Sequence, residues 1–89
     1  MAEEDKAIIE FPLEFPIKVM GEASEEFTAS IVKTIQTIWP EFDHQHVELR
    51  SSSGGRYISL TCTVWATSRE QLDDIYRAIT AHPDVKYVL

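Results

Sequence analysis

Hydrophobic and polar residues alternate strictly over residues 57–66, which predicts a β-strand with two different faces. Every second residue from Ile58 to Ala66 is apolar and can face a core. The residues between them share the other face; they are Tyr57, Ser59, Thr61, Thr63 and Trp65. That second face is amphipathic, so it is a candidate surface for a partner or a ligand.

Three further segments have strand character. Residues 17–20 predict a short strand, and Gly21 after it permits a sharp turn. The preceding residues 8–16 contain two prolines, which predicts an irregular lead-in at a sheet edge. Alternation over residues 43–50 predicts the next strand, and residues 51–55 predict a loose hairpin loop. Residues 85–89 predict the last strand.

Two segments have the periodicity of amphipathic helices. Ser24 can cap the first helix, which ends by Trp39 because Pro40 follows. Ser68 and Gln71 form a capping-box pattern before the second, and Pro83 lies beyond its end. The apolar stripes consist of Phe27, Ile31, Ile35 and Ile38 in the first helix, and of Leu72, Ile75, Tyr76 and Ile79 in the second.

The order strand, helix, strand, strand, helix, strand predicts an α+β ferredoxin-like βαββαβ fold. Its four-stranded antiparallel sheet has the order 4-1-3-2, and both helices cover one face. We expect a disordered acidic tail over residues 1–7 and a single domain over 8–89. The covered face should include Val47 and Leu49. The open face should gather the polar side of 57–66 with Lys18, Met20, Lys86 and Val88.

The composition of the chain restricts the classes of partner that it can bind. Eight Lys and Arg against fifteen Asp and Glu give a net charge of -7, which disfavours nucleic acid. The residues around Tyr57 also lack the aromatic run of RNA-recognition motifs. No apolar run is long enough to span a membrane, and the acidic start does not resemble a signal peptide, so the expected location is cytoplasmic.

The sequence contains few candidate catalytic or metal-binding residues. Cys62 is in phase with the apolar positions of its strand, so we expect a buried thiol and no nucleophile. His44, His46 and Glu48 would share one face of a strand, but one segment alone is a weak metal site; a polar edge that resists strand pairing is the favoured interpretation. His82 is expected to hydrogen-bond helix carbonyls. No catalytic triad or carboxylate pair is recognisable, so we predict no enzyme, no cofactor and no metal.

Several fragments, taken in order, resemble the YbeD family of small bacterial proteins. They are Phe11-Pro12, the segment from Phe15 to Gly21, Ser53-Gly54, Tyr57-Ile58-Ser59 and the segment from Val85 to Leu89. The resemblance implies a ferredoxin-like domain similar to the amino-acid-binding ACT domains, and a role as a lipoic-acid regulator. In ACT-like domains the ligand lies near the turn after the first strand, which here maps onto Met20, Gly21 and Glu22.

The function predicted from the sequence is therefore a small non-catalytic regulatory module of ACT-like type. It would act through protein contacts or a small anionic metabolite, with a link to lipoate metabolism. The alternative is a homo-oligomeric interaction domain without a ligand, in which a second copy buries the open face or an edge strand. The interaction face comprises Lys18, Tyr57, Ser59, Thr61, Thr63, Trp65 and Lys86.

Overall fold

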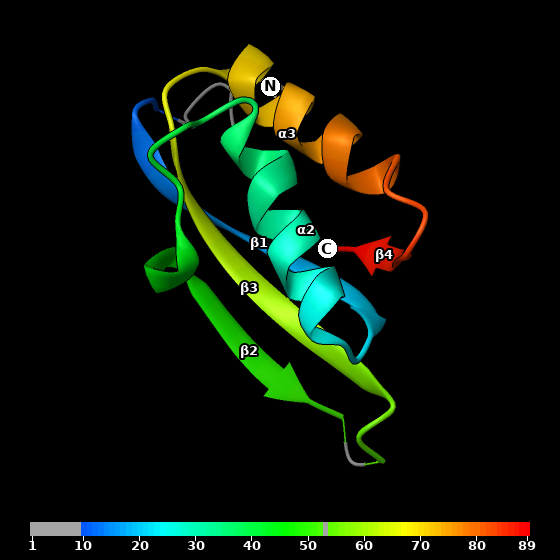
Figure 1. Cartoon of the computed structure of the whole chain (residues 1–89). Helices are drawn as coiled ribbons and strands as arrows, with labels where there is room; N and C mark the ends of the chain where they lie inside the picture. Colours follow the sequence, from blue (N-terminus) through cyan, green and yellow to red (C-terminus); the bar gives the residue numbers. More distant parts are fainter. Residues whose placement is uncertain (1–9, 53) are drawn as a thin grey trace, which may run out of the picture.

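The computed structural model describes residues 10–52 and 54–89. The expected tail over residues 1–7 lies outside this range. The elements in chain order are β1 (Leu13–Glu22), α2 (Glu25–Gln36), the 3-10 helix η1 (His44–His46), β2 (Val47–Ser51), β3 (Tyr57–Ala66), α3 (Arg69–Thr80) and β4 (Val85–Val88). The sheet order β2-β3-β1-β4 confirms the predicted topology. Both helices lie on the same side of the sheet (Figure 1).

Both helices begin at serine caps, as the sequence predicts. The Ser24 hydroxyl accepts a hydrogen bond from the Phe27 N–H at 2.9 Å, and the Ser68 hydroxyl accepts one from the Gln71 N–H at 3.1 Å. The Gln71 side chain accepts from the Thr67 N–H rather than from the Ser68 N–H. The two apolar stripes are thereby fixed toward the sheet.

The core lies between the helices and the inner sheet face. Its buried members are Ile17, Val19, Phe27, Ile31, Val32, Ile35, Phe42, Ile58, Leu60, Cys62, Val64, Ala66, Leu72, Ile75 and Ile79. Leu49 was expected in this layer, yet half of its surface is exposed because β2 extends beyond the cover of the helices (Figure 1). Phe42 was not expected there. Its carbonyl accepts from the Gln36 amide at 2.7 Å, which helps to hold the α2–η1 connection against the core.

The first strand is longer than predicted and contains Pro16. The Lys18 N–H and C=O both bond to Leu89, so the backbone of Lys18 faces β4. Pro16 has the same orientation, because backbone groups alternate sides along a strand. The pairing with β4 reaches no further than Lys18, so the missing Pro16 N–H removes no bond of this ladder. Residues 13–16 therefore continue the strand instead of forming an irregular lead-in.

The second strand is shorter than predicted. It begins at Val47, because Asp43 caps a turn of 3-10 helix before it. The Asp43 carboxylate accepts from the Gln45 N–H at 3.0 Å and lies 2.9 Å from Nδ1 of His46. Asp side chains commonly bond to nearby backbone in this way and thereby compete with strand pairing. Residues 43–46 are therefore not part of the strand.

Candidate functional site

The open face of the sheet carries most of the predicted interaction residues. In the pairing of β1 with β3, Lys18 lies opposite Thr61 and Met20 opposite Ser59, while Ile17 lies opposite the buried Cys62. Side chains alternate between faces, so the polar members of both strands share the side that the helices leave uncovered. Lys18 and Trp65 are exposed there, whereas Tyr57, Ser59, Thr61 and Thr63 are half-buried.

A β-bulge at the start of β4 gives this face its most distinctive feature. Val88 pairs with Val19 and Tyr87 with Met20, but Gly21 pairs with Val85, so Lys86 is the extra residue. A bulge redirects side chains locally. Here Lys86 and Tyr87 both border the same hollow of the open face. Val85 and Val88, three residues apart, both pack against the core.

One expectation changes as a result. Val88 was assigned to the open face, but its partner Val19 places it on the core face. Tyr87 takes that position on the open face, with 52% of its surface exposed, and was missed in the sequence. The spacing of Val85 and Val88 is the signal that could have revealed it. In a regular strand these two valines would face opposite sides.

We use the term tyrosine hollow for the depression of about 300 Å³ lined by Met20, Tyr57, Lys86 and Tyr87. A smaller depression of about 90 Å³ adjoins it; it shares Met20 and Tyr57 and also contacts Arg50. The tyrosine hollow thus has two phenol rings and a thioether as apolar walls, a lysine at one end, and an arginine beyond the other end.

The predicted interaction residues do not form a single site. Tyr57 and Lys86 border the tyrosine hollow. Thr61 and Thr63 border a separate depression next to β2, and Trp65 lies opposite Glu14 at the other end of the β1–β3 pair. The open face is therefore a row of small features with the tyrosine hollow at one end.

The predicted ligand residues Met20, Gly21 and Glu22 also separate. All three belong to β1, so Gly21 is not a turn residue, and its φ is not positive. Met20 borders the tyrosine hollow, while Glu22 borders a different one of about 220 Å³. Gly21 is buried on the core side against the ring of Phe27. A common ligand for the three residues stays a prediction.

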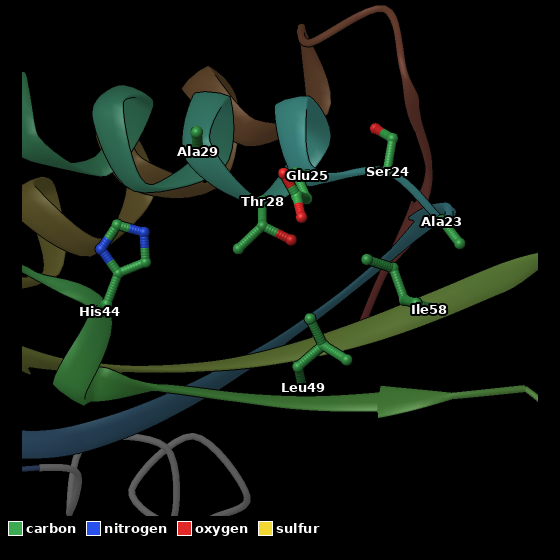
Figure 2. A pocket seen from close by; sticks show the side chains of 8 residues that line it. All are labelled: Ala23, Ser24, Glu25, Thr28, Ala29, His44, Leu49 and Ile58. Carbon is green, nitrogen blue, oxygen red and sulfur yellow. The ribbon is translucent and has the colours of Figure 1, made fainter.

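A depression larger than the tyrosine hollow lies on the helix side, between α2 and β2. This groove of about 490 Å³ is mostly apolar, and Figure 2 shows Leu49 pointing into it from β2. Its lining consists of Ala23, Ser24, Glu25, Thr28, Ala29, His44, Leu49 and Ile58. It exists because no helix of the described chain lies over β2, which leaves the inner side of the edge strand open.

The remaining candidate groups have structural contacts. Cys62 is fully buried, and burial raises the pKa of its thiol to about 12, so the thiol stays protonated at neutral pH. His46 bonds to Asp43, whereas His44 lines the apolar groove. Within residues 10–52 and 54–89, no group of three or more His, Cys, Asp or Glu is arranged to hold a metal ion.

His82 has a different role from the one expected. Its Nδ1 accepts from the Asp84 N–H at 3.1 Å, so the ring proton is on Nε2. That nitrogen donates to the Ser30 hydroxyl at 2.8 Å, and the hydroxyl donates to the Phe27 carbonyl at 3.0 Å. The side chain therefore joins α2 to the turn before β4 and bonds to no carbonyl of α3.

Nothing in the described helices is long and apolar enough to cross a membrane.

Comparison with known proteins places the chain in a bacterial family. A family model described as protein of unknown function (DUF493) matches residues 6–89. A UPF0250 protein of Paraburkholderia phytofirmans is 54% identical over the whole of both chains. One from Nitrosomonas europaea is 47% identical over 96% of this chain and 98% of its own.

A solved structure supports the fold. The solution structure of protein HP0495 from H. pylori superimposes with a TM-score of 0.81, covering 100% of this chain and 93% of the other. Its sequence identity is 16%, so this likeness concerns the fold. From the family match and the sequence relatives together, the chain belongs to the DUF493 family, and the two relatives named above are UPF0250 proteins.

Proposed function

We propose that this protein is a non-catalytic regulatory module that binds a small amphipathic carboxylate in the tyrosine hollow. The observation that carries the proposal is the β-bulge of β4, which brings Lys86 to the same hollow as Tyr87, Met20 and Tyr57. An ammonium group beside two aromatic rings provides both a charge partner for a carboxylate and apolar walls for the remainder of the molecule.

The charge distribution favours a local anion site. The chain as a whole carries -7, so it repels anions at long range. Lys86 at one end of the tyrosine hollow and Arg50 next to the adjoining depression oppose this locally, although Lys86 also borders the neighbouring depression that Glu22 and Asp84 line. A ligand of short length with one carboxylate matches this pattern better than a polyanion does, because a polyanion would extend over the acidic surroundings.

The expected ligand classes are amino acids and lipoate. The former follow from the likeness to ACT domains, and lipoate follows from the predicted link to lipoic-acid regulation. Binding would regulate a partner protein because Tyr57 belongs both to the tyrosine hollow and to the wider interaction face that ends at Trp65. A ligand against Tyr57 changes the surface that the partner would contact.

A paired-ligand titration tests this proposal. Lipoate and lipoamide have the same apolar body, but only lipoate carries a carboxylate. We expect amide shifts at Met20, Tyr57 and Tyr87 in NMR spectra with lipoate or an amino acid, and weaker ones with lipoamide. Lys86→Met should weaken binding of the carboxylate by about tenfold, the scale of one charge-assisted contact.

The matched control is Lys33→Met, which removes an exposed lysine from α2 and should leave binding unchanged. Equal affinities for lipoate and lipoamide would show that Lys86 does not bind the carboxylate. If neither lipoate nor any amino acid shifts these signals, the tyrosine hollow is not a carboxylate site.

A further inference from the structure

Within the described residues, the outer edge of β2 carries backbone groups that pair with no other strand. The Ser52 N–H donates to the Tyr57 carbonyl at 2.8 Å, so Ser52, Arg50 and Glu48 have their backbone groups turned toward β3. The intervening residues Leu49 and Ser51 must then direct theirs outward. The Val47 N–H bonds to the His44 carbonyl, which leaves only the Val47 carbonyl available.

This edge is complementary to itself. In an antiparallel pair of two copies centred on Leu49, each Leu49 exchanges two hydrogen bonds with its counterpart. The Ser51 N–H of each copy then meets the free Val47 carbonyl of the other. The two hydrogen bonds between the Leu49 residues therefore do not need the Val47 N–H, which already bonds to His44. Residues 47 to 51 of β2 are sufficient to form the whole interface.

Charge selects this register over its neighbours. With Leu49 on the two-fold axis, Glu48 of one copy lies directly opposite Arg50 of the other, twice. Moving the axis by one residue would place either Arg50 against Arg50 or Glu48 against Glu48, which is unfavourable. Both side chains are more than two-thirds exposed in the single chain, and their own contact is long, at 3.8 Å. They are available for a partner.

The apolar side of the edge fits the same arrangement. Leu49 is half exposed and points into the groove between α2 and β2 (Figure 2). In the proposed pair the two Leu49 side chains lie side by side on the inner face, so the second copy supplies an apolar wall to the groove. The isolated chain leaves this surface in water, which is unfavourable.

We propose that two copies of this chain associate through β2 about a two-fold axis at Leu49, forming one continuous eight-stranded sheet. This interface lies at the opposite sheet edge from β4. It shares Arg50 with the depression that adjoins the tyrosine hollow, whereas Glu48 borders neither of these two depressions. Each of the two proposals can fail alone.

The test reverses the charge of Glu48 or of Arg50 and asks whether the dimer still forms. The molar mass is measured by sedimentation velocity over about a hundredfold concentration range. The wild-type chain should approach twice its mass of 10.2 kDa. Glu48→Arg makes both members of each cross-strand charge pair positive, and Arg50→Glu makes both members negative. Each variant alone should dissociate at concentrations at least about tenfold higher than the wild type.

One mixture and one double variant make the result specific. An equimolar mixture of the Glu48→Arg and Arg50→Glu variants should form a heterodimer, because every cross-strand pair is then of opposite charge. The double variant Glu48→Arg/Arg50→Glu should dimerise like the wild type. Glu41→Arg makes the same change in net charge as Glu48→Arg at an exposed loop position, and it should leave the dimer intact.

Other outcomes overturn the proposal. A wild-type chain that stays monomeric throughout the concentration range has no such interface. A dimer that survives both single variants, or one that dissociates on Trp65→Glu, is formed through another surface. Failure of the two single variants to form a heterodimer on mixing would exclude the register centred on Leu49.

Discussion

The ring of Phe27 occupies the space where a side chain at position 21 would begin. A Cβ built on Gly21 would lie 2.7 and 2.8 Å from the Cε1 and Cε2 atoms of that ring. Gly21 is thus required for the close approach of α2 to β1, and not for a turn. The glycine in the Lys-Val-Met-Gly segment marks a packing contact of the core.

Gly21→Ala should therefore destabilise the fold. The added methyl must displace a buried ring, and overpacking of this kind costs about 1–3 kcal/mol. The free energy of unfolding from denaturant titration measures the effect. Gly54→Ala is the control, since nothing lies within 4 Å of its Cβ position. Equal midpoints for the two variants would show that the Phe27 ring can move aside.

The bond between His82 and Ser30 should couple the two halves of the chain. We expect a double-mutant cycle of Ser30→Ala and His82→Ala to give a coupling free energy of about 0.5–1.5 kcal/mol. The measurement is again the free energy of unfolding. Additive effects of the two substitutions would mean that the hydrogen bond adds nothing to stability.

Leu89 should stabilise the fold through the hydrogen bonds of its backbone. The Leu89 N–H donates to the Lys18 carbonyl at 2.8 Å, and the Leu89 carbonyl accepts from the Lys18 N–H at 3.3 Å. Deleting Val88 and Leu89 removes these bonds and a partly buried valine, so we expect a loss of at least about 2 kcal/mol. Leu89→Ala keeps the backbone and removes a side chain that is 62% exposed. This substitution should lower the free energy of unfolding far less than the deletion does. Similar losses for the two variants would contradict a stabilising role of the Leu89 backbone.

Cys62 should make stability fall at high pH. Burial raises the folded-state pKa from 9.0 to about 12, so the folded chain holds the proton more tightly than the unfolded chain. Its contribution is complete below about pH 9 and is lost progressively as the pH rises toward 12. Denaturant midpoints at about pH 8 and about pH 10 should therefore differ more for the wild type than for Cys62→Ala. Identical pH dependence in both proteins would contradict the buried thiol.

The topology could be predicted because each element carries a local signal. Strict alternation in residues 57–66 gives β3 with its observed bounds, and Ser24 and Ser68 mark the two helix starts. Errors arose where a local contact competes with periodicity. Asp43 caps a 3-10 turn although the residues after it alternate like a strand. Pro16 is tolerated in β1 only because the neighbouring strand does not reach it, which depends on the tertiary arrangement.

The candidate site was predictable in part. Alternation places Tyr57 and Lys18 on the open face correctly, but the tyrosine hollow depends on the bulge, which is a property of pairing between β1 and β4. The groove beside Leu49 depends on how far the helices extend over the sheet. No pattern within a single strand or helix contains that information.

The position of Pro16 has a consequence for self-association. A sheet that adds strands at both edges can grow into a fibre, whereas one with a single competent edge stops at two copies. Here β4 is short and bulged, and the part of β1 beyond it lacks a donor at Pro16. If β2 pairs across a two-fold axis, the remaining edge of the described sheet, formed by β4 and the start of β1, is poorly suited to add further strands. The proline thus favours a closed assembly in a crowded cell.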